Sequence, residues 1–350
     1  MKESKSKKNI TLVILKYIAS LSFAGLIIYF LFRNQDPAAL IEKISEVEIG
    51  WVFLSIICGG WAYINRGMRW IVLIDALGYK SSKLNSISAV SVGYFTNLFI
   101  PRAGEISRCT ALNRAEKIPV DKLFGTILIE RVIDFAFLIS LFLLTLSLKL
   151  DLILDFSTEL GFQNSDLESV SFTTFYFLTA LILFFLSVIF DFLDGNILKK
   201  SSNIRKKIKE FLEGFKEGFK SIKKLKRKSV FWFHTFSIWI MYFLMTYICF
   251  QSIPETSNLT LSDGLFLLIL GGIGMVIPTP GGIGSYHAIV MIGLSVLGVG
   301  TIFLGENGNP SNPALLFPTI VHAAQTLVAI IMGSIALLLL FLSKKKQTNE

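Results

Sequence analysis

Residues 264–305 read GLFLLILGGIGMVIPTPGGIGSYHAIVMIGLSVLGVGTIFLG and contain no Asp, Glu, Lys or Arg. Three more stretches lack these residues too, namely 170–190, 229–254 and 313–343. Since a helix needs about 20 apolar residues to cross the hydrocarbon core of a bilayer, each stretch is long enough to span. The 350-residue chain is 53% hydrophobic and only 17% charged, which is more apolar than a soluble domain. The sequence therefore predicts an all-α polytopic membrane protein with one integral domain over 1–350.

The positive charge of the chain is concentrated in one segment. The net charge is +9, and Asn196–Lys228 alone holds thirteen Lys or Arg against three Glu. Apolar residues recur there every three or four positions, so we expect a basic amphipathic helix over 196–228 on the anionic inner leaflet. We expect no nucleic-acid partner. The three cysteines lie far apart without metal-ligand spacing, so we predict no metal site and no cofactor.

Loop charges predict the topology, because cytoplasmic loops are enriched in Lys and Arg. A basic N-terminus (1–9) and a lysine-bearing tail (343–350) place both chain ends in the cytoplasm of a bacterial-type cytoplasmic membrane. The first apolar run ends in Leu-Phe-Arg (31–33), without the small residues of a cleavage site, so we read it as an uncleaved span. The six predicted crossings are Ile10–Phe32, Trp51–Ile74, Leu123–Leu148, Val170–Phe190, Val230–Phe250 and Ala314–Leu342.

Two apolar segments remain, and parity requires each to enter and leave on the same side. The first, over 84–122, turns at Pro101, and the second, over 264–304, turns at 278–284. Paired Gly/Pro-interrupted segments are typical of inverted-repeat transporters, where they mark the binding site. We therefore predict two opposed re-entrant hairpins and an inverted repeat. The alternative for the second hairpin is two ordinary spans, which would give eight crossings.

The first turn has the features of an anion site. Pro101 ends one helix, Gly104 loosens the backbone, and Glu105 begins a short helix whose free N–H groups face the turn. Guanidinium groups bind phosphate in a bidentate manner. The predicted headgroup-binding residues here are Asn97, Pro101, Arg102, Gly104, Glu105 and Arg108; alternatively, the arginines anchor the chain at the cytoplasmic interface.

The second turn, IPTPGGIGSYH over 277–287, resembles the first but has no charge. Its prolines stop one helix, and its glycines allow a tight backbone before the next helix, Ser285–Leu304, points its positive dipole end inward. It lacks the Lys-Ser/Thr of a nucleotide-binding loop. The predicted headgroup-binding residues are Pro278, Pro280, Gly281, Gly282 and Gly284, although ordinary membrane-helix glycines remain the alternative.

Ionisable residues lie inside the predicted third span. Glu130 and Asp134 are one helical turn apart, and Arg131 can reach Asp134. Intramembrane ions are costly and functional by default, so we expect a polar lining, or else a purely structural clamp. Arg66 and Arg69 either join this lining or extend to the interface. His234 and His322 are single histidines in apolar helices and are expected to be packed side chains.

These three motifs, in this order, resemble the lysylphosphatidylglycerol synthase transmembrane region, also called the flippase-like membrane family. The resemblance covers residues 10–342 and implies a stand-alone member, because the sequence ends at Glu350 without the soluble aminoacyltransferase domain. Where family members often carry a glutamate, three residues after the last motif glycine, this chain has His287. The sequence departs from the family pattern at this position, and we expect His287 to belong to the polar lining.

The resemblance implies a flippase for an anionic or phosphate-linked lipid headgroup, either a phospholipid such as lysyl-phosphatidylglycerol or a polyprenyl-phosphate-linked sugar. The expected partners are thus membrane lipids. Two alternatives stay open. One is a membrane enzyme of lipid modification, against which the chain shows neither HExxH nor a DxD pair; the other is an accessory subunit of a cell-envelope pathway. The sequence leaves the oligomeric state open.

Overall fold

A computed structural model describes residues 2–33, 35–159, 225–301 and 312–348. These residues are helical and include no β-strand, which confirms the predicted all-α class. The α-helices are α1 (Lys2–Phe32), α2 (Pro37–Ser45), α3 (Ile49–Ala76), α4 (Lys83–Phe99), α5 (Gly104–Glu116), α6 (Val120–Glu159), α9 (Lys228–Tyr247), α10 (Leu261–Val276), α11 (Ser285–Val296) and α12 (Pro313–Thr348), and the 3₁₀ turns are η1 (Ile248–Ser252), η2 (Pro254–Thr256) and η3 (Pro280–Gly282).

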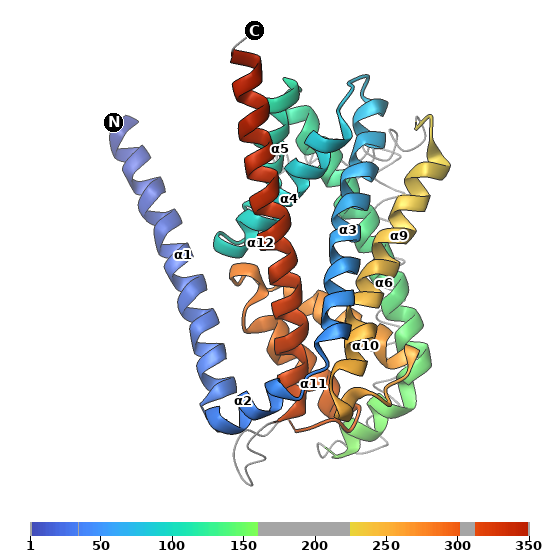
Figure 1. The fold of residues 1–350 in the computed structure, drawn as a ribbon. Helices are drawn as coiled ribbons and strands as arrows, with labels where there is room; N and C mark the ends of the chain where they lie inside the picture. The colour runs from blue at the N-terminus through green and yellow to red at the C-terminus, as the bar shows by residue number, and fades with distance from the viewer. Residues whose placement is uncertain (1, 34, 160–224, 302–311, 349–350) are drawn as a thin grey trace, which may run out of the picture.

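Long helices form the frame of the molecule, and short helices fill its two halves. Helices α1, α3, α6, α9 and α12 run along its length (Figure 1). The hairpin α4–α5 lies in the upper half of the view and the hairpin α10–α11 in the lower half (Figure 1). The beginning of α1 and the end of α12 lie at the same end of the bundle, as an even number of crossings requires (Figure 1).

Length and composition identify some of the described helices as membrane spans. Lys228–Ser252 and Pro313–Leu340 are long and apolar enough to cross, and the pair Ala38–Ser45 and Ile49–Ala76, bent by 79°, would be a third span. The predicted span Val170–Phe190 and the basic segment 196–228, apart from its last four residues, lie outside the described residues.

The second hairpin is shorter than the sequence indicated. The predicted helix Ser285–Leu304 ends at Val296, because Gly298 has a φ of 76° and breaks the helical path. At 1.5 Å per residue, α10 is about 24 Å long and α11 about 18 Å, against about 30 Å of hydrocarbon. These lengths favour the re-entrant interpretation over two full spans.

One helix, α2, replaces part of the predicted loop between the first two spans. Its N-cap, Asp36, accepts a hydrogen bond from the Ala38 N–H at 2.9 Å, and Pro37 occupies the first turn. Both are standard helix-start signals. Lys43 then pairs with Glu46 at 2.9 Å and with Glu255 at 3.4 Å, which ties α2 to η2.

The long helix α6 has a break just beyond the predicted span end at Leu148. Lys149 has non-helical angles, φ −128° and ψ 18°. Its Nζ lies 2.5 Å from Asp263 Oδ1, and Asp263 also closes the capping box with Thr260 at the start of α10. The ion pair therefore joins the end of one predicted crossing to the entrance of the second hairpin.

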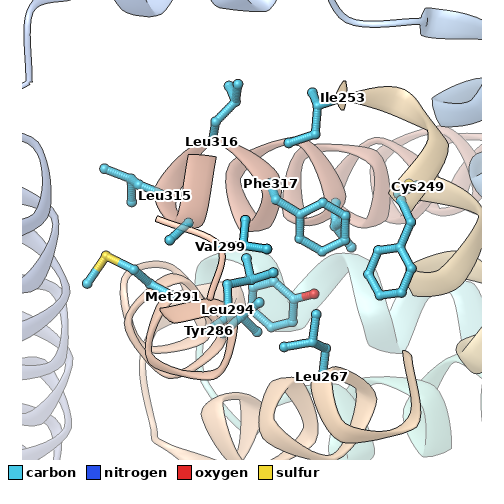
Figure 2. Close-up of a cluster of buried hydrophobic side chains, with 14 of the residues drawn as sticks. Cys249, Ile253, Leu267, Tyr286, Met291, Leu294, Val299, Leu315, Leu316 and Phe317 are labelled. Atoms are coloured by element: carbon cyan, nitrogen blue, oxygen red, sulfur yellow. The ribbon is translucent and has the colours of Figure 1, made fainter. Parts of the chain in front are cut away.

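An apolar core surrounds the base of the second hairpin. Side chains from α10, α11, α12 and η1 converge there, with Tyr286, Leu294 and Phe317 among them (Figure 2). The three cysteines of the chain, Cys58, Cys109 and Cys249, are buried and unpaired. This core fixes the base of the hairpin and leaves its tip to meet the opposite half of the molecule.

Helices α3 and α4 approach closely at Gly67. A Cβ atom there would lie 2.6 Å from Ile87 Cγ1 and 2.7 Å from Ile87 Cα. We expect Gly67→Ala to lower the free energy of unfolding by about 1–3 kcal/mol through overpacking, measured by denaturation in detergent micelles. Gly60→Ala, in the same helix, is the matched control because its Cβ would meet nothing within 4 Å. Equal stability of the two variants would contradict this packing.

Candidate functional site

The tips of the two hairpins touch each other. Arg102 Nη2, beyond the end of α4, donates to the Val276 carbonyl oxygen of α10 at 3.2 Å. A Cβ atom on Gly281 would lie 3.3 Å from Leu98 Cδ2 and 3.5 Å from Leu98 Cα. The two Gly/Pro turns, far apart in the sequence, therefore meet between the two halves of the molecule.

The first tip is held together by its own backbone and one side chain. Asn97 Oδ1 accepts a hydrogen bond from the Gly104 N–H at 2.7 Å, which caps the start of α5. A Cβ on Gly104 would lie 2.4 Å from the Gly93 carbonyl oxygen, so α4 and α5 cross in near contact. Arg102 has a φ of 62°, an uncommon conformation for a residue with a side chain.

The second tip depends on glycine and on two polar contacts. Gly281, Gly282 and Gly284 have φ values of 59°, 81° and 82°, which glycine adopts without steric cost. Thr279 Oγ1 and Ser285 Oγ lie 2.8 Å apart across the turn, and His322 Nε2 contacts the Gly281 carbonyl oxygen at 2.9 Å.

Behind the first tip lies a buried ion cluster. Arg69, which is fully buried, donates to Asp134 through Nη1 at 2.8 Å and through Nη2 at 3.2 Å. Its Nε lies 3.4 Å from Glu130 Oε1. Glu130 is also approached by Arg108 Nη2 at 2.8 Å, and the Arg108 guanidinium stacks 3.9 Å from the Trp70 ring centre. The cluster therefore joins α3, α5 and α6.

A second arginine of α3 extends the cluster towards α9. Arg66 Nη2 donates to Asp134 Oδ2 at 3.0 Å, and its Nε donates to the Tyr242 hydroxyl at 2.7 Å. That hydroxyl lies 3.1 Å from the Tyr94 hydroxyl. Arg131 approaches Asp134 only to 4.0 Å, and 43% of its side chain is exposed.

The charges of this cluster do not cancel. Among its described members, the four guanidinium groups of Arg66, Arg69, Arg108 and Arg131 face the two carboxylates of Glu130 and Asp134, so four minus two leaves a net charge of +2. Uncompensated charge inside a membrane protein is expensive. An anion bound beside the cluster would reduce this excess of positive charge.

A cavity of about 480 Å³ lies beside the cluster, and both hairpins contribute to its walls. Polar side chains line it from α3, α4, α6 and α9, and apolar residues line it from α10. Helix α12 contributes both kinds, with His322 and Gln325 as well as Val328. The lining side chains with polar groups include Tyr63, Arg66, Tyr94, Arg131, Trp239 and Tyr242.

A match to a protein family covers most of the chain. The model of the lysylphosphatidylglycerol synthase TM region matches residues 17–333. The chain belongs to this family. It is also 24% identical over 338 residues to the UPF0104 membrane protein MJ1595 of Methanocaldococcus jannaschii, an alignment that covers 90% of this chain and 94% of the relative. No solved structure matches the chain.

Membership in the lysylphosphatidylglycerol synthase TM family identifies the chain as an integral membrane protein of lipid metabolism or transport. Five of the residues predicted from sequence line the cavity of this family member. They come from both hairpins and from the ion cluster: Asn97, Arg66, Arg131, Asp134 and Gly281.

The other predicted residues of this family member surround the cavity without lining it. Arg69, Arg108 and Glu130 form the buried part of the ion cluster. Arg102 is exposed at the first tip. His287 is buried, with its ring centre 4.9 Å from that of His322. The remaining residues belong to the two tips: Pro101, Gly104, Glu105, Pro278, Pro280, Gly282 and Gly284.

The aromatic side of the cavity could hardly be predicted from the sequence of this family member. Tyr63 and Tyr94 stack with ring centres 4.3 Å apart, and Trp239 and Tyr242 lie on α9. The one indication in the sequence is that Tyr63 lies three residues before Arg66, so both side chains lie on the same face of the helix. Of the histidines, His322 lines the cavity, whereas His234 Nδ1 contacts Asn65 Oδ1 at 2.7 Å.

Proposed function

We propose that this protein moves a lipid with a phosphate-containing, anionic headgroup across the membrane. The observation that carries the proposal is the excess of four guanidinium groups over two carboxylates beside a cavity of about 480 Å³, where three of the four arginines are buried and the fourth, Arg131, is partly exposed. Guanidinium groups match phosphate in charge and in fork geometry. A headgroup in the cavity would supply the missing negative charge.

The hairpin tips give the cavity two sides that can move separately. The first hairpin contributes Asn97 and Leu98, and the second contributes Gly281 and part of α10. The tips meet through the hydrogen bond from Arg102 to the Val276 carbonyl oxygen and through the contact of Gly281 with Leu98. A shift of either hairpin that breaks these contacts would open the cavity to one side of the membrane. Alternating shifts would then carry the headgroup across.

The border of the cavity suits the acyl chains of a lipid. Phe135, Met275 and Val276 line the cavity and are 57%, 48% and 61% exposed. They form an apolar edge between α6 and α10. The headgroup would pass this edge while the acyl chains stay in the bilayer.

The test is headgroup translocation by purified protein in proteoliposomes. We expect Arg131→Gln to slow the movement of fluorescent phosphatidylglycerol by about three- to tenfold, as the loss of one partly exposed phosphate partner predicts. Arg131 makes only a weak ion pair, so the variant should fold.

Arg33→Gln is the matched control for this experiment. It removes the same charge from an exposed position outside the cavity, where Arg33 lies over the Phe30 ring, and should transport at the wild-type rate. If the wild-type protein moves no anionic lipid, the proposed function is wrong. If it moves the lipid and both variants transport at the same rate, Arg131 is not part of the headgroup site.

A further inference from the structure

Two hydrogen-bond donors on the cavity wall have no partner. Arg66 Nη1 and Trp239 Nε1 are buried and make no hydrogen bond, and the Arg66 side chain is only 5% exposed. Buried donors without partners are rare and costly. Both atoms are donors only, so a ligand that reached them after a side-chain shift would have to offer acceptor oxygens.

The carboxylates near the cavity already form ion pairs with arginines. Among the described residues that line it, Asp134 is the acidic one, and its oxygens accept from Arg66 and Arg69 at 2.8–3.2 Å. Glu130, behind it, lies between Arg69 and Arg108. No carboxylate on the described wall is therefore left to pair with an ammonium group.

The aromatic side of the cavity is not free to bind a cation either. Aromatic rings attract ammonium groups, but here the guanidinium of Arg66 lies 5.7 Å from the Tyr94 ring centre and 5.6 Å from that of Tyr242. A second cation at these rings would sit beside Arg66 and close to Arg131, and like charges repel strongly in a medium of low dielectric constant. The rings instead offer hydroxyl groups and flat apolar faces.

We infer that the cavity selects a phosphodiester or pyrophosphate headgroup whose other groups are uncharged and hydroxylated, such as a glycerol, an inositol or a sugar. It excludes a headgroup with free ammonium groups, such as a lysyl ester. This inference rests on the proposed function and narrows it. It also separates this chain from the aminoacylated lipid in its family's name.

Phosphatidylglycerol and lysyl-phosphatidylglycerol form a matched pair of probes, because they differ only by the lysyl ester. In phosphatidylcholine proteoliposomes, we expect the wild-type protein to move fluorescent phosphatidylglycerol at least about tenfold faster than fluorescent lysyl-phosphatidylglycerol. The reason is the electrostatic repulsion between the lysyl ammonium groups and the arginines of the cavity. Native mass spectrometry of the purified protein with both lipids should show the same preference in binding.

A charge substitution tests the cause of the preference. Gln325 lies on the α12 wall of the cavity and hydrogen-bonds with Tyr286, and Gln325→Glu places a carboxylate there that is not paired with an arginine. We expect this change to lower the ratio of phosphatidylglycerol to lysyl-phosphatidylglycerol movement by about fivefold or more. Gln251→Glu introduces the same charge at an exposed residue of η1 and should leave the ratio unchanged.

The outcomes separate the two proposals. Equal movement or equal binding of the two lipids would overturn the inference while leaving lipid transport intact. Selective binding of phosphatidylglycerol without movement of any lipid would support the inference on the headgroup and overturn the proposed transport. An unchanged ratio in a folded Gln325→Glu protein would show that cavity charge does not set the preference and would overturn the inference.

Discussion

Arg69→Met should lower the free energy of unfolding by about 3–5 kcal/mol, the cost of removing one partner from a buried ion pair. Arg69 is fully buried and donates twice to Asp134 while facing Glu130. Methionine fills much of the volume but leaves both carboxylates with one fewer cation. Thermal and chemical denaturation in detergent would measure the loss.

Two further variants separate charge from packing at this position. Arg69→Lys keeps the charge but not the planar fork that reaches Asp134 through two nitrogens, so we expect an intermediate loss. Combining Arg69→Met with Asp134→Asn removes one charge of each sign. The double variant should therefore lose less free energy of unfolding than the two single variants lose in sum. Wild-type stability of Arg69→Met would mean that the cluster does not hold α3 against α6.

Arg66→Gln should reduce the transport of anionic lipid by about tenfold or more, because a hydrogen bond to a charged group contributes about 1.5–3 kcal/mol. Arg66 is the buried arginine that lines the cavity, and it has a nitrogen without a partner. Initial rates in proteoliposomes, normalised to folded protein by size-exclusion chromatography, would measure the effect.

Arg66→Lys and Arg33→Gln complete this comparison. Lysine retains the positive charge, but its single ammonium group cannot contact both Tyr242 and Asp134 and still offer a donor to the headgroup. We therefore expect a transport rate between those of the wild-type protein and Arg66→Gln. Arg33→Gln, away from the cavity, should transport normally. A folded Arg66→Gln protein with the wild-type rate would remove this arginine from the headgroup site.

The sequence predicted the elements whose signals are local. Proline and glycine stop and turn a helix wherever they occur, so both hairpin turns could be placed at Pro101 and at Pro278–Gly284. The helix α2 was not predicted, because this segment was assigned as a loop from its charge and from the lengths of the apolar runs on either side. Asp36 and Pro37 are nevertheless a helix-start signal. The end of α11 was placed too late because apolar content alone does not show that Gly298 leaves the helix.

The partners within the site could not be predicted, because they come from different helices. Sequence spacing favoured Arg131 as the partner of Asp134, three residues away on α6, yet Arg69 of α3 lies closer, at 2.8 Å against 4.0 Å. Arg108 was expected to face the turn and instead reaches Glu130 at 2.8 Å. A single sequence identifies the ionisable residues of a membrane segment, but it does not show which helices pack against each other.

The burial of all three cysteines has a practical consequence for thiol chemistry. Cys58 is 8% exposed, and Cys109 and Cys249 are fully covered, and buried thiols are inert towards water-soluble reagents. The native chain can therefore serve as the background for maleimide labelling. A cysteine introduced at Ile100 or at Ile283, both exposed near a hairpin tip, would carry the labelling signal and report from which face of the membrane that tip is reached.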